Sequence, residues 1–242
     1  MKTIEIRDIS KKFGEHVVLN HITVRFQEGS IYGIVGRNGS GKTVLLECIC
    51  GLIHQDEGTI IVNGKEIGKK VDMADNIGVI IETPGFLPNY SGFRNLQFLM
   101  GVNKKVNSSM ISAAMKMVGL NPHEKKKVGK YSLGMKQRLG IAQAIMENPD
   151  ILILDEPLNG LDSAGVDEIR KILLDMKKQG KTILLASHNN EDIQEARYIH
   201  TEGLPPALCR YILHLPLHLH DAVHVALCRR VGRQGPFFGC PC

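Results

Sequence analysis

The sequence lacks any apolar run close to the roughly 20 residues that a membrane-spanning helix needs. It also lacks an apolar block near its start, where Lys2, Glu5 and Arg7 carry charge, so we predict no secretion signal. Without such a signal, its 6 cysteines in 242 residues do not indicate a secreted disulfide framework. We therefore expect a cytosolic protein, with Cys48 and Cys50 as small core residues.

The charge of the sequence is small and scattered. The formal net charge is +5, and the densest basic cluster comprises residues 125–127 and Lys130. Short lysine runs are common on solvated surfaces, so we expect no nucleic-acid partner. Apolar residues make up 43% and charged residues 23%, as in an ordinary globular protein, and the length suits one domain with a sub-domain.

Apolar patterns predict strands that alternate with helices. Residues 3–6 and 22–26 alternate between apolar and polar side chains, which favours two strands joined by a turn. Four short apolar runs are typical of buried strands in a parallel sheet: residues 31–35, 77–81, 151–156 and 182–186. We predict an α/β fold with a mostly parallel sheet, an N-terminal antiparallel β part and an inserted α-helical sub-domain at about residues 90–148.

A glycine-rich loop between a predicted buried strand and a predicted helix fits the pattern G-x-x-x-x-G-K-T. Its glycines let successive backbone N–H groups point at phosphate oxygens, and the helix adds the positive end of its dipole. Lys42 would supply charge to the β- and γ-phosphates, and the Thr43 hydroxyl would bind Mg²⁺. The candidate nucleotide-binding residues are Gly36, Arg37, Asn38, Gly39, Ser40, Gly41, Lys42 and Thr43.

Two acids, Asp155 and Glu156, end another apolar strand. Residues at the carboxyl end of a parallel strand face the ligand crevice, so Asp155 could hold Mg²⁺ and Glu156 could deprotonate the attacking water. An acidic pair after a strand is often only a helix N-cap, but the glycine loop favours the catalytic role. The sequence has no N-K-x-D element to bind guanine, so ATP is favoured over GTP.

Residues 131–139, Y-S-L-G-M-K-Q-R-L, resemble the L-S-G-G-Q signature of the ABC (ATP-binding cassette) ATPases, which are P-loop NTPases. Ser132 and Gly134 hold the matching positions, whereas Leu133 and Met135 look like the variant of the ABC-2 type exporter branch. A serine and a glycine ahead of a helix also offer a hydroxyl and N–H groups to an anion. A plain N-cap would account for Ser132 alone.

The resemblance extends to four further positions. Residues 159–162 are similar to the D-loop, in which Asp162 would communicate between two subunits, and His188 resembles the histidine that contacts the γ-phosphate. Phe13 stands where the family places an aromatic ring on adenine, although it is equally compatible with a core position. Glu82 replaces the usual glutamine that binds Mg²⁺ and water, as in exporters of peptide antibiotics and bacteriocins.

This resemblance implies an ATP-hydrolysing transporter subunit, with Glu156 as general base and with Thr43, Asp155 and Glu82 serving Mg²⁺. Two copies would close head to tail, so that each ATP lies between one phosphate loop and the partner's Ser132 and Gly134. A membrane-spanning permease would dock near residues 82–92 and the helical segment behind them, which implies a peripheral position at the cytoplasmic face of the membrane. The alternatives are a non-transport cassette and a cassette that binds ATP without hydrolysis.

We assign residues 1–196 to the cassette and residues 197–242 to an atypical tail. Every lysine lies at or before Lys181, and histidine, cysteine and proline become frequent in the tail, where the closing strands of the family are not evident. The tail could bind a metal, regulate the protein or result from a shifted reading frame. We favour the last, because no C-x-x-C pair accompanies the candidate ligands His214, His218, His220 and His224.

Overall fold

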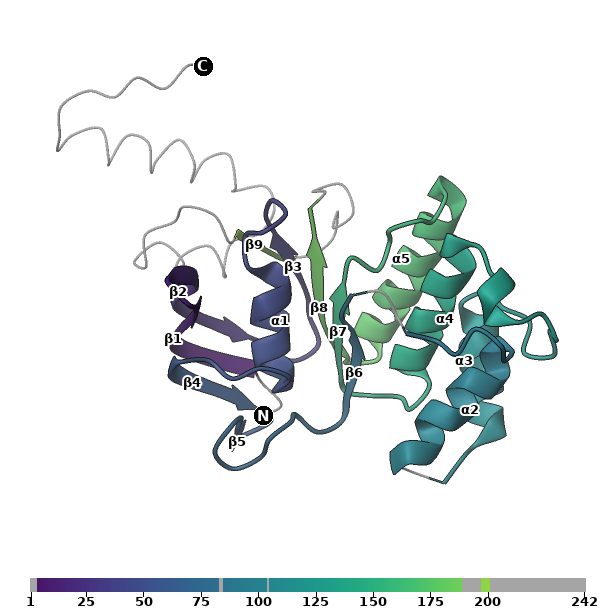
Figure 1. Cartoon of the computed structure of the whole chain (residues 1–242), viewed down its shortest axis with the longest axis horizontal. Helices are drawn as coiled ribbons and strands as arrows, with labels where there is room; N and C mark the ends of the chain where they lie inside the picture. Colours follow the sequence, from purple (N-terminus) through teal and green to yellow (C-terminus); the bar gives the residue numbers. More distant parts are fainter. Residues whose placement is uncertain (1–3, 83–84, 104, 189–196, 201–242) are drawn as a thin grey trace, which may run out of the picture.

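A computed structural model describes residues 4–82, 85–103, 105–188 and 197–200. Two β-sheets and five α-helices make up this part of the chain (Figure 1). None of the helices in these ranges is long and apolar enough to cross a membrane.

The first sheet is antiparallel, with the strand order β2-β1-β4-β5. It confirms the predicted N-terminal β part, but its first two strands are longer than predicted. The β1–β2 pairing contains register shifts, which interrupt the apolar alternation and hid the full strand length from the sequence. The strands are β1 (Ile4–Phe13), β2 (His16–Phe26), β4 (Glu57–Val62) and β5 (Lys65–Glu66).

The second sheet is parallel throughout, with the order β6-β7-β8-β3-β9. Every residue of β3, β7 and β8 is buried, which explains their continuous apolar sequences. The strands are β3 (Ile31–Val35), β6 (Ile77–Ile80), β7 (Ile151–Asp155), β8 (Thr182–Ser187) and β9 (Arg197–His200).

Strand β9 lies in the segment that the sequence analysis assigned to the tail. It pairs with β3 along four residues, so the parallel sheet extends beyond residue 196. Its sequence, Arg-Tyr-Ile-His, has no apolar run, and the pattern therefore gave no sign of a strand. The four candidate metal-binding histidines, His214, His218, His220 and His224, lie outside the described residues.

Helices cover the two faces of the parallel sheet differently. Helix α1 (Lys42–Cys50) lies between the sheets and contacts β7 on one side and β2 and β4 on the other (Figure 1). Cys48 and Cys50 are buried in this layer, and burial raises their thiol pKa values to about 11 and about 12, as expected for core cysteines. The opposite face packs against the helices α4 (Leu133–Ile145) and α5 (Ser163–Lys178).

The predicted helical sub-domain contains α2 (Gly92–Asn103), α3 (Ser108–Met117), the 3₁₀ turn Val128–Lys130 and α4. Helix α4 approaches β6 so closely that a Cβ on Gly78 would lie 2.0 Å from the Ala144 carbonyl oxygen. Only glycine fits there, so the packing fixes α4 against the strand that leads to Glu82.

Candidate functional site

The glycine-rich loop joins β3 to the first turn of α1. Gly39 and Gly41 have φ angles of 83° and 90°, in the left-handed region that favours glycine. Gly41 is the N-cap of α1. As a glycine it has no side chain to accept from the backbone N–H groups of the first helical turn. A Cβ on Gly41 would lie 3.0 Å from the Val18 carbonyl oxygen. The loop therefore presents the amino end of a helix, which suits the binding of a phosphate group.

Lys42 is buried, although lysine is rarely buried without an acidic partner. Its Nζ donates to the carbonyl oxygens of Gly36 at 2.7 Å and Arg37 at 3.2 Å. Among the described residues, no carboxylate forms an ion pair with it. The ammonium group is thus held over the loop by neutral acceptors, and its charge can serve an anionic ligand.

Thr43 and Asp155 join the loop to the end of β7. The Thr43 hydroxyl donates to Asp155 Oδ2 at 2.6 Å, while Asp155 Oδ1 is buried and has no hydrogen-bond partner. Burial is the main cause that raises the Asp155 pKa, although the Thr43 hydrogen bond and the Lys42 charge lower it. A buried carboxylate oxygen without a partner, beside a hydroxyl, fits Mg²⁺, which prefers oxygen ligands.

Glu156 contacts His188 at the ends of neighbouring strands. Glu156 Oε1 and His188 Nδ1 are 2.9 Å apart, and Glu156 Oε2 is buried without a partner. An ionised carboxylate only accepts hydrogen bonds, so Nδ1 is the nitrogen that donates. The Glu156 backbone has a φ of 48°, a strained conformation for a non-glycine residue that is common at functional sites.

Glu82 lies just after β6, is exposed and has a φ of 60°. Its charge is among the causes that raise the pKa values of Asp155 and of Glu47, for which burial comes first. The sequence analysis did not include Glu47 among the acidic residues near the site. It lies one helical turn after Thr43 and therefore on the same side of α1. Within the described ranges, no three His, Cys, Asp or Glu side chains come together as a metal site. Of the three predicted Mg²⁺ residues, Thr43 and Asp155 are in contact with each other.

Ser132 and Asp162 are both helix N-caps. Ser132 Oγ accepts from the Met135 N–H at 3.2 Å at the start of α4, and Asp162 Oδ1 accepts from the Gly165 N–H at 2.9 Å at the start of α5. The two segments touch, because a Cβ on Gly134 would lie 3.0 Å from the Gly160 carbonyl oxygen. The signature-like segment and the D-loop-like segment are therefore neighbours within one chain.

Phe13 ends β1 and is 51% exposed, so it is not a core residue. The Lys11 Nζ lies 5.4 Å from the centre of its ring. An exposed aromatic ring of this kind offers a face for stacking.

Some of the predicted site residues therefore contact one another, and others lie elsewhere in the fold. The described contacts join Thr43 to Asp155 and Glu156 to His188 at the carboxyl edge of the parallel sheet, where ligands of open α/β sheets bind. The Ser132 and Asp162 contacts lie at the amino ends of α4 and α5, and Phe13 lies on the antiparallel sheet.

Comparisons with known proteins identify the family of the chain. Residues 19–159 match the ABC transporter family. An uncharacterised ABC transporter ATP-binding protein of Bacillus subtilis (strain 168), YybJ, is 46% identical over 190 residues, which cover 78% of this chain and 87% of that protein. The chain therefore belongs to the ABC transporter family.

Other relatives have named roles. The bacitracin transport ATP-binding protein BcrA of Enterococcus faecalis is 42% identical, with 79% of this chain matching 63% of that protein. The lantibiotic transport ATP-binding protein SrtF of Streptococcus pyogenes is 36% identical, over 79% of this chain and 82% of the relative. The dimeric structure of the bacterial ABC transporter cassette MJ0796 superposes with a TM-score of 0.73 at 23% identity, over 82% of this chain and 94% of that chain.

Family membership confirms several expectations from the sequence. It confirms the P-loop NTPase fold, ATP and Mg²⁺ as ligands, and ATP hydrolysis by a transporter subunit. The roles of individual residues stay predictions.

Replacing Asp155 with Asn is expected to stabilise the nucleotide-free protein at neutral pH. The raised pKa means that the ionised carboxyl destabilises the fold as the pH rises above its ordinary value of 3.8. The neutral amide oxygen can still accept from Thr43. At pH 7.5 the thermal midpoint should rise by roughly 2–4 °C, which is about 1 kcal/mol for a chain of this size, and the gain should shrink toward pH 4.

Asp56→Asn is a control that should change the thermal midpoint in the opposite direction. Its carboxylate accepts from Lys11 Nζ and from the Lys12 N–H, both at 2.8 Å, and these bonds lower its pKa. Its stabilising contribution is therefore present at neutral pH and lost in acid, so Asp56→Asn should lower the midpoint at pH 7.5. A lower midpoint for Asp155→Asn as well would contradict the electrostatic account.

Proposed function

We propose that this chain hydrolyses ATP to drive a membrane-spanning permease that exports peptide antibiotics, working at the cytoplasmic face of the membrane. The observation that carries the proposal is the alignment of Thr43 with Asp155 and of Glu156 with His188 at one sheet edge. The named roles of the bacitracin and lantibiotic relatives support the substrate class.

The roles of the residues follow from their positions. Lys42 and the loop amides would bind the β- and γ-phosphates, and Thr43 and Asp155 would hold Mg²⁺, which neutralises phosphate charge. Glu156 would accept a proton from the attacking water, because its Oε2 has no hydrogen-bond partner that competes for it. His188 would fix the orientation of the Glu156 carboxylate through its Nδ1–H, which leaves Nε2 for the γ-phosphate.

We further propose that two copies close head to tail around ATP. Ser132 and Leu133 are exposed at the amino end of α4, where a helix end and a hydroxyl could meet a phosphate of the second copy. The MJ0796 cassette, which is dimeric in its solved structure, supports this arrangement.

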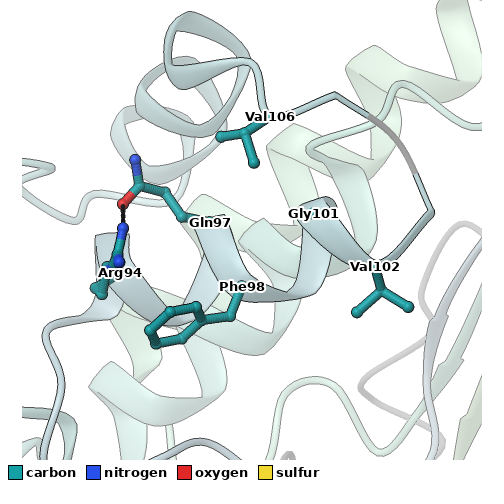
Figure 2. A pocket seen from close by; sticks show the side chains of 6 residues that line it. All are labelled: Arg94, Gln97, Phe98, Gly101, Val102 and Val106. Carbon is teal, nitrogen blue, oxygen red and sulfur yellow. Dashed lines mark hydrogen bonds between the residues drawn. The ribbon is translucent and has the colours of Figure 1, made fainter.

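The helical sub-domain has a hollow that suits the permease. Figure 2 shows Arg94 and Phe98 on α2, with Val106 from the segment before α3 facing the same region. The hollow measures about 480 Å³, and Val102 and Val106 at its border are 76% and 40% exposed. Its remaining lining residues are Gln97 and Gly101. This exposed apolar surface is typical of an interaction site.

The charge of Arg94 indicates what occupies the hollow. Its guanidinium lies over the Phe98 ring at 4.6 Å and donates to Gln97 Oε1 at 3.1 Å (Figure 2). No carboxylate in the described part of the chain pairs with it. We infer that a cytoplasmic helix of the permease inserts an apolar side chain beside Phe98 and directs an acidic side chain at Arg94.

The Glu156→Gln variant should bind Mg-ATP and form a stable dimer without turnover. Gln keeps the acceptor for His188 but cannot take the proton from water. Light scattering should show a monomer without nucleotide and a dimer with Mg-ATP, while wild type returns to a monomer after hydrolysis. A variant that binds ATP and stays monomeric would contradict the head-to-tail dimer. A variant that hydrolyses ATP as fast as wild type would indicate that Glu156 is not the base.

The Arg94→Glu variant should lose the permease but keep its own ATPase activity. Charge reversal would place two acids together, and we expect at least a tenfold loss of affinity. The measurement is recovery of the subunit with a tagged membrane protein encoded beside it. Lys116→Glu on α3 makes the same charge change outside the hollow and should bind normally. Equal recovery of both variants would contradict the docking proposal.

A further inference from the structure

Gln137 is a buried polar residue on α4 that the proposed chemistry does not use. Its Nε2 donates to the backbone carbonyl oxygen of Glu156 at 3.2 Å. The bond joins α4 directly to the residue proposed as the general base. It acts on the backbone of Glu156, and therefore on where its carboxylate points.

The Glu156 backbone needs such support because of its strained φ of 48°. Its N–H donates to the Ala186 carbonyl at 3.0 Å, and its carbonyl also accepts from the Asn159 N–H at 3.3 Å. The Asn159 bond is local, within the turn after β7. Of the described bonds to this carbonyl, only that of Gln137 comes from the helical sub-domain.

Leu133 makes a second contact from the same helix to the same loop. A Cβ on Gly160 would lie 2.5 Å from both Cγ and Cδ2 of Leu133, so the leucine occupies the space above this glycine. Gly160 also has a φ of 77°, which favours glycine there. Helix α4 thus touches the loop after β7 at Glu156 and again at Gly160.

We propose that Gln137 is a positioning residue. Together with Leu133, it makes the direction of the Glu156 carboxylate depend on the position of α4. The inference rests on the proposed function, in which Ser132 at the amino end of α4 meets ATP held by the second copy. Binding at that end would then hold Gln137, and through it the Glu156 backbone of the same chain. Each copy would hydrolyse its ATP efficiently only after engaging the ATP of its partner.

The test replaces Gln137 with Met, which has a similar length and volume but no N–H donor. We expect kcat to fall roughly 10- to 100-fold, while KM for ATP changes by less than about threefold, because no phosphate contact is removed. The Hill coefficient for ATP should move toward 1. Leu133→Ala, which removes the contact with Gly160 at an exposed position, should change kcat and cooperativity in the same direction.

Gln137→Met is repeated in the Glu156→Gln background. ATP-dependent dimerisation there should remain, which shows that this variant folds and binds ATP. If Glu156→Gln alone does not dimerise, the proposed function fails before this inference is reached. If it dimerises and Gln137→Met keeps the wild-type kcat and Hill coefficient, the positioning role is wrong. A raised KM with unchanged kcat would likewise overturn it.

If Gln137→Met does not fold, an unchanged kcat in Leu133→Ala would refute the coupling.

Discussion

The hydrogen bond from the Thr43 hydroxyl to Asp155 Oδ2 is the contact on which the rest of the site depends. It joins the first turn of α1 to the end of β7, through two residues that are 112 positions apart in the sequence. Through it, the loop that would hold phosphate and the strand that carries both acids share one edge of the parallel sheet. The two strands pair as far as Asp155 opposite Ala186, so the residue after β8, His188, reaches Glu156 at this edge.

Several groups at the same edge destabilise the nucleotide-free protein. Burial raises the Asp155 pKa, Lys42 is buried over neutral carbonyls, and Glu82 and Glu156 have positive φ angles. Such features destabilise a protein unless a ligand or the surrounding fold compensates. Mg-ATP would supply positive charge beside Asp155 and negative charge beside Lys42. The packed core around β7 and β8 and the bonds to the Glu156 backbone hold the arrangement in place.

Much of this arrangement could be predicted because it is encoded in local patterns. The glycine loop and the acids after β7 stand in short, specific motifs, and the buried strands appear as continuous apolar runs. Strand β9 could not be predicted, because its four residues pair with β3 through backbone bonds that leave no mark in the sequence. Gln137 was also missed. Its importance lies in a contact with a residue 19 positions away, and a glutamine in an amphipathic helix has no distinctive pattern.

In the proposed chemistry, Glu156 is the general base that deprotonates the water attacking ATP bound by the loop at residues 36–43. Single-turnover release of phosphate measures this role, with enzyme in excess over radiolabelled Mg-ATP and bound nucleotide measured in parallel. We predict that wild type converts its bound ATP, while Glu156→Gln binds the same amount and releases phosphate roughly 10²–10⁴-fold more slowly. Equal rates for the two proteins at equal occupancy would show that Glu156 is not the general base.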